Sequence, residues 1–391
     1  MGGDVSLIEP ALLERHVELR SGSLDLRVLR ADLSLDELLG FAARANPKRG
    51  FLFVSKVLGK HIPCRPHVMR RVYETLADLI GPLDSGALVI GMAETATGLG
   101  AGVADSLARR HEPGQIISQH TTRHPTSGDL WVTFDESHSH APDHLLYRPL
   151  NYIEMEVDRA RSLVLVDDEI TSGRTLMMLA REIEAAWSGP LDEIVLVSIV
   201  SWLTPERRRA LESSLSAPVR CVSLLEGDFS FSPHPDFNPR LPGQVSPTRQ
   251  ARLSRSDLGR RGVNPLSSTP TMWVEELIST LDASRPISVI GTGEFAYQPF
   301  LLAESLERAG FKVTYQSSTR SPILLGGAIS ESVAINDEHG EGVSNYLHNP
   351  PTSGHRQVIV AYESEECARR HELPEVLEAT RWVAPQSMDH T

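Results

Sequence analysis

The chain has 391 residues, of which 40% are hydrophobic and 23% charged, and its formal net charge is −13. These values exclude a disordered chain, a fibrous repeat and a disulfide-rich miniprotein. The acidic balance argues against a general nucleic-acid coat, but it permits a locally positive site for a small anion. The three cysteines form no CxxC pair, no apolar run suits a membrane span, and the first residues lack a signal core. We therefore expect a cytoplasmic protein.

Short apolar runs alternate with helical segments along most of the chain. The first part shows strands at 87–91, 163–167 and 194–200, followed by helices at 100–110, 174–187 and 204–214. The last part shows helices at 271–282 and 297–309 and strands at 286–290, 311–316 and 357–362. This alternation predicts βαβ units and mainly parallel sheets.

The segment 226–270 interrupts this pattern. It is rich in Ser, Pro, Arg and Asn and almost lacks periodicity, which predicts an interdomain linker or an irregular arm. We find no internal repeat. The sequence therefore predicts an α/β domain over 1–225 and a second α/β domain over 271–391.

The most informative motif covers residues 164–175. An apolar strand brings Asp167 and Asp168 to its carboxyl end, where ligands bind in open α/β sheets. The loop that follows consists of Thr171, Ser172, Gly173, Arg174 and Thr175. It opens a helix, whose N-terminal amides and nearby hydroxyls suit a phosphomonoester. The paired carboxylates suit neighbouring sugar hydroxyls, directly or through Mg²⁺. The alternative is an ordinary capped helix with exposed acids.

This stretch resembles the phosphoribosyl pyrophosphate (PRPP) signature of type I phosphoribosyltransferases. The family pattern is an apolar strand, two acids, two variable residues and then Thr-Thr/Ser-Gly-x-Thr. The resemblance implies a type I parallel sheet with a hood. It also implies that Asp167 and Asp168 bind the ribose hydroxyls and Mg²⁺, and that 171–175 binds the 5′-phosphate. Glu169 departs from the pattern, which has an apolar residue there, and we expect it to face solvent.

Residues 89–100, VIGMAETATGLG, resemble the loop that follows the first core strand in the same family. In that family the loop binds pyrophosphate through backbone N–H groups, and small residues allow the close approach. The residues in that place are Ala93, Glu94, Thr95 and Ala96. The alternative is an ordinary connection between a strand and a helix.

A long polar stretch with five histidines, 118–144, lies between these motifs. The resemblance implies a mobile catalytic loop here, with Arg123 neutralising the leaving pyrophosphate. His138, His140 and His144 also permit a zinc site, although the spacing is a weak signal. We favour contacts of these histidines to substrate or phosphate, and the remaining alternative is that they have no catalytic role.

Residues 46–63, NPKRGFLFVSKVLGKHIP, predict a hairpin with Gly59 near its turn. The segment resembles the hood of orotate phosphoribosyltransferase, although Val54 stands where that family has lysine. The resemblance implies a hood over about 40–66 that selects the acceptor. Its cations are Lys48, Arg49, Lys56 and Lys60. The alternative is a solvated basic hairpin.

The predicted second domain contains two polar loops, each after a predicted strand. One is the turn with Gly291 and Gly293, and the other contains Thr319, Arg320 and Ser321. Hydroxyls around an arginine suit a phosphate or carboxylate, so we predict a second anion site. The alternative is a packed turn in which Arg320 forms a structural ion pair.

Taken together, segments 46–63, 164–175 and 319–322 resemble the bacterial phosphoribosyltransferases encoded with tellurite-resistance and stress genes. Their carboxyl-terminal domain is named TRSP for its Thr-Arg-Ser-Pro motif. The resemblance implies Mg²⁺-dependent transfer from PRPP to a small-molecule acceptor in a nucleoside-like pathway, by a chain that could form a homodimer.

Two further functions are compatible with the sequence. One is a PRPP-sensing regulator that contacts RNA through an arginine-rich stretch. The arginines of that stretch are Arg249, Arg252, Arg255, Arg260 and Arg261. The second is a hydrolase of a phosphorylated nucleoside, because the same site would bind its product.

Overall fold

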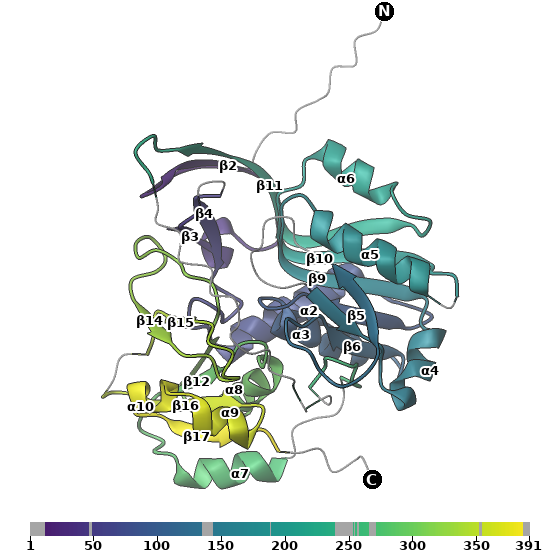
Figure 1. The fold of residues 1–391 in the computed structure, drawn as a ribbon. Helices are drawn as coiled ribbons and strands as arrows, with labels where there is room; N and C mark the ends of the chain where they lie inside the picture. Colours follow the sequence, from purple (N-terminus) through teal and green to yellow (C-terminus); the bar gives the residue numbers. More distant parts are fainter. Residues whose placement is uncertain are drawn as a thin grey trace, which may run out of the picture.

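The computed structural model describes residues 12–46, 49–134, 144–187, 189–238, 253, 255, 258–265, 271–351 and 354–385. Within them the chain forms a seven-stranded sheet, a four-stranded sheet and three two-stranded sheets. Figure 1 shows the larger sheet above the smaller one, with helices between them. The prediction of α/β architecture is confirmed.

The larger sheet has the strand order β1-β2-β11-β10-β9-β5-β6. Its strands are β1 (Leu13–Leu19), β2 (Gly22–Ala31), β5 (Ala87–Gly91), β6 (Ile116–His120), β9 (Ser162–Ile170), β10 (Glu193–Ser201) and β11 (Val219–Pro233). From β11 to β6 all neighbours are parallel, whereas β1 and β2 add an antiparallel edge. The parallel strands are runs of Val, Ile and Leu because helices cover both of their faces.

The order of the strands in the sheet determines on which face each connecting helix lies. The main ones are α2 (Pro66–Ile80), α3 (Thr97–Ala108), α5 (Arg174–Ala186) and α6 (Pro205–Glu212). The chain steps from β5 to β6 in one direction and from β9 to β10 in the other. Because such crossovers are right-handed, α3 lies on one face of the sheet and α5 on the opposite face (Figure 1). The switch point between β5 and β9 is where such sheets bind ligands.

Between β6 and β9 the chain forms a hairpin and a helix. These elements are β7 (Leu130–Phe134), β8 (His144–Tyr147) and α4 (Asn151–Arg159). The hairpin occupies part of the stretch that the resemblance assigned to a mobile loop. The described residues of this stretch therefore include strands, and the mobile catalytic loop stays a prediction.

The hood consists of α1 (Leu35–Leu38), β3 (Leu39–Ala43) and β4 (Phe51–Ser55). Its turn lies between β3 and β4, so the prediction that Gly59 stands near the turn is wrong. Aromatic packing fixes the hood on the large sheet. The Phe53 ring lies 4.7 Å from Trp202 and 5.1 Å from Phe229, measured between centroids.

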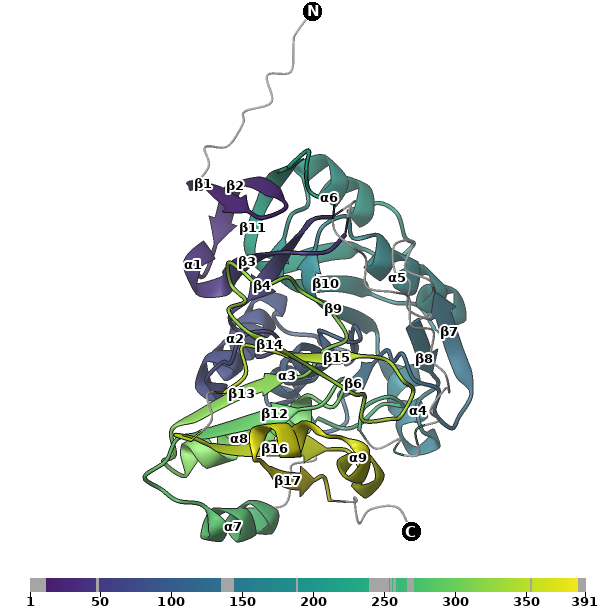
Figure 2. The same cartoon turned by 60° about the vertical axis from the view of Figure 1, so that its left-hand side comes forward.

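The smaller sheet has the order β13-β12-β16-β17, and all its strands are parallel. Its strands are β12 (Ile287–Gly291), β13 (Val313–Ser317), β16 (Gln357–Tyr362) and β17 (Thr380–Val383). Its helices are α7 (Thr271–Thr280), α8 (Tyr297–Arg308), α9 (Glu365–Arg370) and α10 (Leu373–Leu377). Figure 2 shows the hairpin of β14 (Ser332–Ile335) and β15 (Asn345–His348) between the hood and this sheet.

The two sheets are joined through α2, α3 and α8, whose apolar residues belong to one continuous core. A buried ion-pair network crosses this junction. The Arg70 guanidinium lies 2.7 Å from the Glu304 carboxylate and 2.6 Å from that of Asp105. The Tyr73 and Phe300 rings pack beside it, 5.1 Å apart. The junction is therefore an interior and not a loose contact between two domains.

Two expectations about organisation need correction. The predicted boundary at 225 lies inside β11, which continues to Pro233 because it pairs with β2 along that length. The prediction of no internal repeat is also wrong, because the order β13-β12-β16-β17 reproduces β6-β5-β9-β10. Among the described helices none is both long and apolar enough to cross a membrane.

Candidate active site

Asp167 and Asp168 lie at the carboxyl end of β9, at the switch point of the large sheet. The strand runs to Ile170, beyond its predicted end, because hydrogen bonding to β10 continues past the apolar run. The Asp168 amide donates to Asp167 Oδ1 at 2.9 Å, which orients the Asp167 carboxylate. Burial raises the pKa of Asp168. Two such carboxylates are suitable oxygen donors for Mg²⁺ or for sugar hydroxyls.

The loop 171–175 leads directly into α5. Gly173 stands at the N-cap with φ 67°, and a Cβ there would lie 2.6 Å from Leu211 Cδ1. No side chain caps α5, although the Arg174 amide donates to Ser172 Oγ at 3.4 Å. Thr171 and Thr175 are half-buried. The start of α5 can therefore offer backbone amides to an anion.

Glu169 does not face solvent, so that expectation is wrong. Its side chain is 13% exposed, and both its oxygens accept from Arg49 Nη2, at 2.7 and 2.9 Å. Burial, reinforced by the charge of Asp168 and opposed by Arg49, raises the pKa of Glu169 to about 7. Arg49 therefore ties the hood to β9 and is not an unengaged cation for an acceptor.

The loop after β5 folds back on itself at Ala93 and Glu94, between which the peptide bond is cis. The Ala93 amide donates to Thr121 Oγ1 at 2.8 Å, which ties this loop to the end of β6. Thr95 is half-buried and Ala96 is fully buried. Burial opposes ionisation of Glu94, yet the charges of Lys60, Arg320 and Arg123 lower its pKa. A strong positive potential therefore surrounds this loop.

Lys60 is the hood cation that the structure brings into the site. Its side chain is 4% exposed, and Nζ lies 2.8 Å from Glu94 Oε1 and 2.8 Å from the Gly293 carbonyl oxygen. Lys60 thus bridges the loop after β5 and the loop after β12. Lys56 instead donates to the Asp36 carbonyl, away from these loops. Lys48 lies outside the described residues.

Arg123 lies three residues after the end of β6. Its backbone amide donates to Glu294 Oε1 at 2.7 Å, and Nη2 lies 3.4 Å from His144 Nε2. Its backbone is thus anchored to a residue of the second sheet. His144, His120 and His124 are buried, whereas His138 and His140 lie outside the described residues.

The second predicted anion site lies beside the first. The Gly293 amide donates to Ser318 Oγ at 3.0 Å, which closes the turn that begins at Gly291. The Arg320 amide lies 3.4 Å from Glu94 Oε2, and its guanidinium pairs with buried Glu341 at 2.7 Å. This contact is the one expected of a structural ion pair, and anion binding by Arg320 stays a prediction.

The remaining members of the TRSP motif order its backbone. Thr319 forms two backbone hydrogen bonds with Tyr346 of β15, and the Ser321 amide donates to the Thr319 hydroxyl at 3.2 Å. Both residues therefore hold Arg320 in place at the end of β13. The predicted hydrogen bonds from their hydroxyls to an anion stay a prediction.

Several buried charges lie between the sheets, and apart from Arg260, which was considered for RNA contact, the sequence predictions assigned them no role. Arg260 pairs with Glu294 at 3.2 Å and Glu363 at 2.9 Å. Glu363, His339 and Cys367 form the one group of three that could hold a metal in the part of the chain that the structure describes. Because Arg260 already neutralises Glu363, we assign no metal there. The sequence did offer a signal for Glu294, because VIGTGE at 289–294 is similar to VIGMAE at 89–94, which ends in the candidate site residue Glu94.

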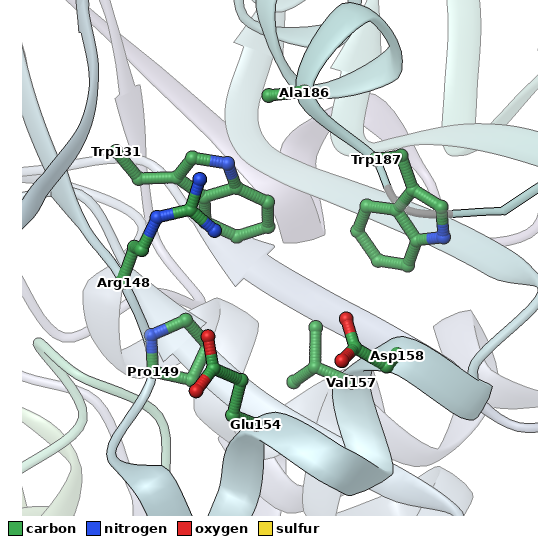
Figure 3. Close-up of a pocket in the computed structure, with 8 residues that line it drawn as sticks. All are labelled: Trp131, Arg148, Pro149, Glu154, Val157, Asp158, Ala186 and Trp187. Carbon is green, nitrogen blue, oxygen red and sulfur yellow. The ribbon is translucent and has the colours of Figure 1, made fainter.

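A separate hollow lies at the far end of α5 (Figure 3). Trp131 and Trp187 stand on opposite sides of it, with their ring centroids 6.0 Å apart, and Arg148 lies over the Trp131 ring. Trp187 follows the last residue of α5, whereas the candidate site lies at its first residue. At 1.5 Å per residue the helix separates the two by about 18 Å. This hollow is therefore not part of the site.

A parallel sheet that carries this acid pair and phosphate-type loop at its switch point defines a type I phosphoribosyltransferase-like protein. Residues 38–228 match the family model of phosphoribosyl transferases. Residues 257–379 match the TRSP domain that lies carboxyl-terminal to it. The chain therefore belongs to the proteins that join these two domains.

Among solved structures, adenine phosphoribosyltransferases match about half of the chain. The Giardia lamblia enzyme with 9-deazaadenine is 15% identical, with a TM-score of 0.33, over 47% of this chain and 92% of that one. The Trypanosoma brucei enzyme with AMP, pyrophosphate and ribose-5-phosphate is 15% identical, with a TM-score of 0.35, over 50% of this chain and 83% of that one. The Thermoanaerobacter pseudethanolicus enzyme is 14% identical, with a TM-score of 0.31, over 48% of this chain and 96% of that one. No curated protein matches the chain.

Proposed function

We propose that the protein is an Mg²⁺-dependent phosphoribosyltransferase that moves ribose 5-phosphate from PRPP to a small-molecule acceptor. The observation that carries the proposal is the junction of β9 and α5. There a pair of half-buried carboxylates precedes a glycine-opened helix N-terminus that no side chain caps. Family membership of residues 38–228 supports this reading.

Each element has a part in the proposed reaction. The 5′-phosphate binds the amides and hydroxyls of 171–175, and the ribose hydroxyls bind Asp167 and Asp168. Pyrophosphate lies along the loop at 93–96, where Lys60 and Arg123 supply positive charge. The bond from ribose C1 to the pyrophosphate oxygen breaks, and the acceptor nucleophile forms the new bond to C1. Catalysis then consists of positioning the reactants and stabilising the charge of the leaving group.

The proposed metal fits the donor set. Asp167 and Asp168 offer the oxygen ligands that Mg²⁺ prefers, directly or through water. Bound Mg²⁺ would neutralise part of the pyrophosphate charge. We further propose that the hood and the second sheet select the acceptor, and that the product serves a nucleoside-like pathway connected with stress or tellurite resistance. The support for that pathway is the resemblance of the whole chain to the family.

The RNA-binding alternative has less support. Arg260 is buried in two ion pairs, and Arg255 donates to the carbonyls of Glu363 and Ala384. Arg261 donates to the Arg148 carbonyl, whereas Arg249 and Arg252 lie outside the described residues. The hydrolase alternative makes a different product. Pyrophosphate release that needs an acceptor favours transfer, and release of a free base from a nucleotide favours hydrolysis.

The variant Asp168→Asn tests the proposal. We expect PRPP affinity in Mg²⁺, measured by isothermal titration, to fall by more than about tenfold, because a hydroxyl-binding or metal-binding charge is lost. The melting temperature should be kept, because no apolar core is opened. Asp36→Asn, at an exposed acid of the hood, is the matched control. Unchanged affinity in Asp168→Asn would remove the central assignment.

A further inference from the structure

Three short motifs of the first part of the chain occur again in the second part. Leu-Gly-Lys at 58–60 returns as Leu-Gly-Arg at 258–260. The pattern VIGxxExA occurs at 89–96 and 289–296, and QxxTRxP occurs at 119–125 and 316–322. The second and third pairs each stand at the same place in their sheets, after β5 and β12 and after β6 and β13. We call strands β6-β5-β9-β10 the first core and β13-β12-β16-β17 the second core.

The two cores agree in register as well as in strand order. Gly91 pairs with His120 at the end of β5, and Gly291 pairs with Ser317 at the end of β12. A hairpin follows β6 in the first core and β13 in the second. The threonine of the QxxTRxP motif forms a β-bridge with this hairpin. The bridges are Thr122 to Leu145 in the first core and Thr319 to Tyr346 in the second.

Side-chain hydrogen bonds repeat in the same way. Gln119 Nε2 donates to the Tyr147 carbonyl at 2.6 Å, and Gln316 Nε2 donates to the His348 carbonyl at 3.1 Å. A loop amide two residues after Gly91 or Gly291 donates to a matching hydroxyl. The Ala93 amide donates to Thr121 Oγ1 in the first core, and the Gly293 amide donates to Ser318 Oγ in the second. The second core is therefore a structural copy of the first and not an unrelated α/β domain.

The cores contact each other reciprocally. The Arg123 amide of the first core donates to Glu294 of the second, and the Arg320 amide of the second core lies against Glu94 of the first. Edge segments are exchanged in the same manner. Cys64 bridges to Tyr315 of β13, and Val263 bridges to Ser118 of β6. Such matched pairs are the mark of a two-fold interface between subunits, which here lies within one chain.

The described residues of the second core contain no counterpart of the loop 171–175. Its register places Glu363 where the first core has Asp168. Where the first core continues with 171–175, α9 begins at Glu365, and Ser364 caps it by accepting from the Cys367 amide. The first turn of α9 also carries two acids, which repel an anion.

Arg260 closes what is left of this second site. Its side chain is 2% exposed and spans the two acids, 3.2 Å from Glu294 and 2.9 Å from Glu363. These acids correspond to Glu94 and Asp168 of the first core. A guanidinium therefore stands where a ligand would have to reach both carboxylates.

We propose that the second core is a built-in partner subunit, closed to ribose phosphates, which positions Arg123 of the first core through Glu294. The chain then has one PRPP site for its two cores. This inference rests on the proposed function for the identity of the ligand, but the positioning by Glu294 does not depend on it.

Glu294 is suited to this task because its carboxylate is fully engaged. Oε1 accepts from the Arg123 amide at 2.7 Å, and Oε2 accepts from the Thr122 hydroxyl at 2.6 Å and from Arg260. Burial opposes its ionisation, but the charges of His124 and Arg260 hold the pKa of Glu294 well below its usual range. It is therefore a positioning residue that fixes the backbone from which Arg123 extends.

The test compares Glu294→Gln with Glu363→Gln in the full-length chain. Both variants take one carboxylate from Arg260, but only the first loosens the backbone at Arg123. Amide hydrogen exchange of unliganded protein over 119–125 should accelerate by about tenfold or more in Glu294→Gln and stay unchanged in Glu363→Gln. PRPP titration in Mg²⁺ should give one site per wild-type chain, with about tenfold weaker binding in Glu294→Gln alone.

Two results would overturn the inference: two PRPP molecules bound per chain, or equal acceleration of exchange over 119–125 in both variants. Should Glu294→Gln not fold, Thr122→Val removes one hydrogen bond to Glu294 and gives the same comparison. A wild-type chain that binds no PRPP refutes the proposed function, while the exchange data, taken without ligand, still decide whether Glu294 positions Arg123.

Discussion

Lys60→Met should destabilise the protein strongly, because it removes the nearest counter-charge of a buried carboxylate. Nζ lies 2.8 Å from Glu94 Oε1, and the two side chains are 4% and 10% exposed. Breaking a buried ion pair by removing one partner costs about 3–5 kcal/mol. Because Arg320 and Arg123 also stabilise the Glu94 charge, we expect a loss near the lower end, about 3 kcal/mol at pH 8.

The pH dependence distinguishes this explanation from simple loss of packing. In the wild type the pKa of Glu94 lies below its usual value. The ionised carboxylate therefore adds to the free energy of unfolding above that usual value, and this stabilisation is lost as the pH falls. In Lys60→Met burial prevails and raises the pKa of Glu94, so its ionisation destabilises the fold as the pH rises. Urea unfolding should therefore show a larger difference from wild type at pH 8 than at pH 5.

Lys56→Met is the matched control, because Lys56 lies in the same hood but donates only to the Asp36 carbonyl. We expect it to change the free energy of unfolding by less than about 0.5 kcal/mol. Adding Glu94→Gln to Lys60→Met should recover most of the loss at pH 8. Equal losses at both pH values, or an equal effect of Lys56→Met, would refute the electrostatic reasoning.

Three further outcomes are expected. Gly173→Ala, at φ 67°, should cost about 1–2 kcal/mol in urea unfolding and weaken ribose 5-phosphate binding in titration. The pKa of Glu169 is about 7 in the folded protein and 4.5 ordinarily, so the free energy of unfolding of the wild type falls as the pH rises between these values. The free energy of unfolding of Glu169→Gln should therefore rise by roughly 2 kcal/mol relative to that of the wild type between pH 5 and pH 8. Arg320→Ala should lower the melting temperature because buried Glu341 loses its arginine partner, and unchanged stabilisation by pyrophosphate would assign Arg320 a structural role only.

The sheet and the PRPP-type motif could be predicted because their signals are local. The apolar run 163–167 identifies a buried strand, and the acids and glycine that follow are adjacent in sequence. The true end of β9 could not be predicted in this way. Its last residues are held by pairing with β10, and such pairing leaves no trace in a hydrophobic pattern.

The fate of Glu169 shows why side-chain roles are harder to predict. A charged residue after two acids suggests solvent, but Arg49 lies far from it in sequence and meets it only because the hood folds over the sheet. The hood in turn is oriented by the packing of Phe53 on Trp202 and Phe229. Neither contact follows from spacing along the chain, so the partner of Glu169 had to come from the structure.

The two cores show how one pattern can support opposite outcomes. Lys60 and Arg260 end the same Leu-Gly motif, but an ammonium is a compact point charge, whereas a planar guanidinium can engage two carboxylates at once. Lys60 accordingly pairs with Glu94, and Arg260 joins Glu294 to Glu363. In the first core the strand β9 continues to Ile170 and Gly173 opens α5, whereas in the second core β16 ends at Tyr362 and the Ser364 side chain caps α9. The proposed PRPP site and the closed second site therefore differ in one cation and in the segment that joins the strand to the helix.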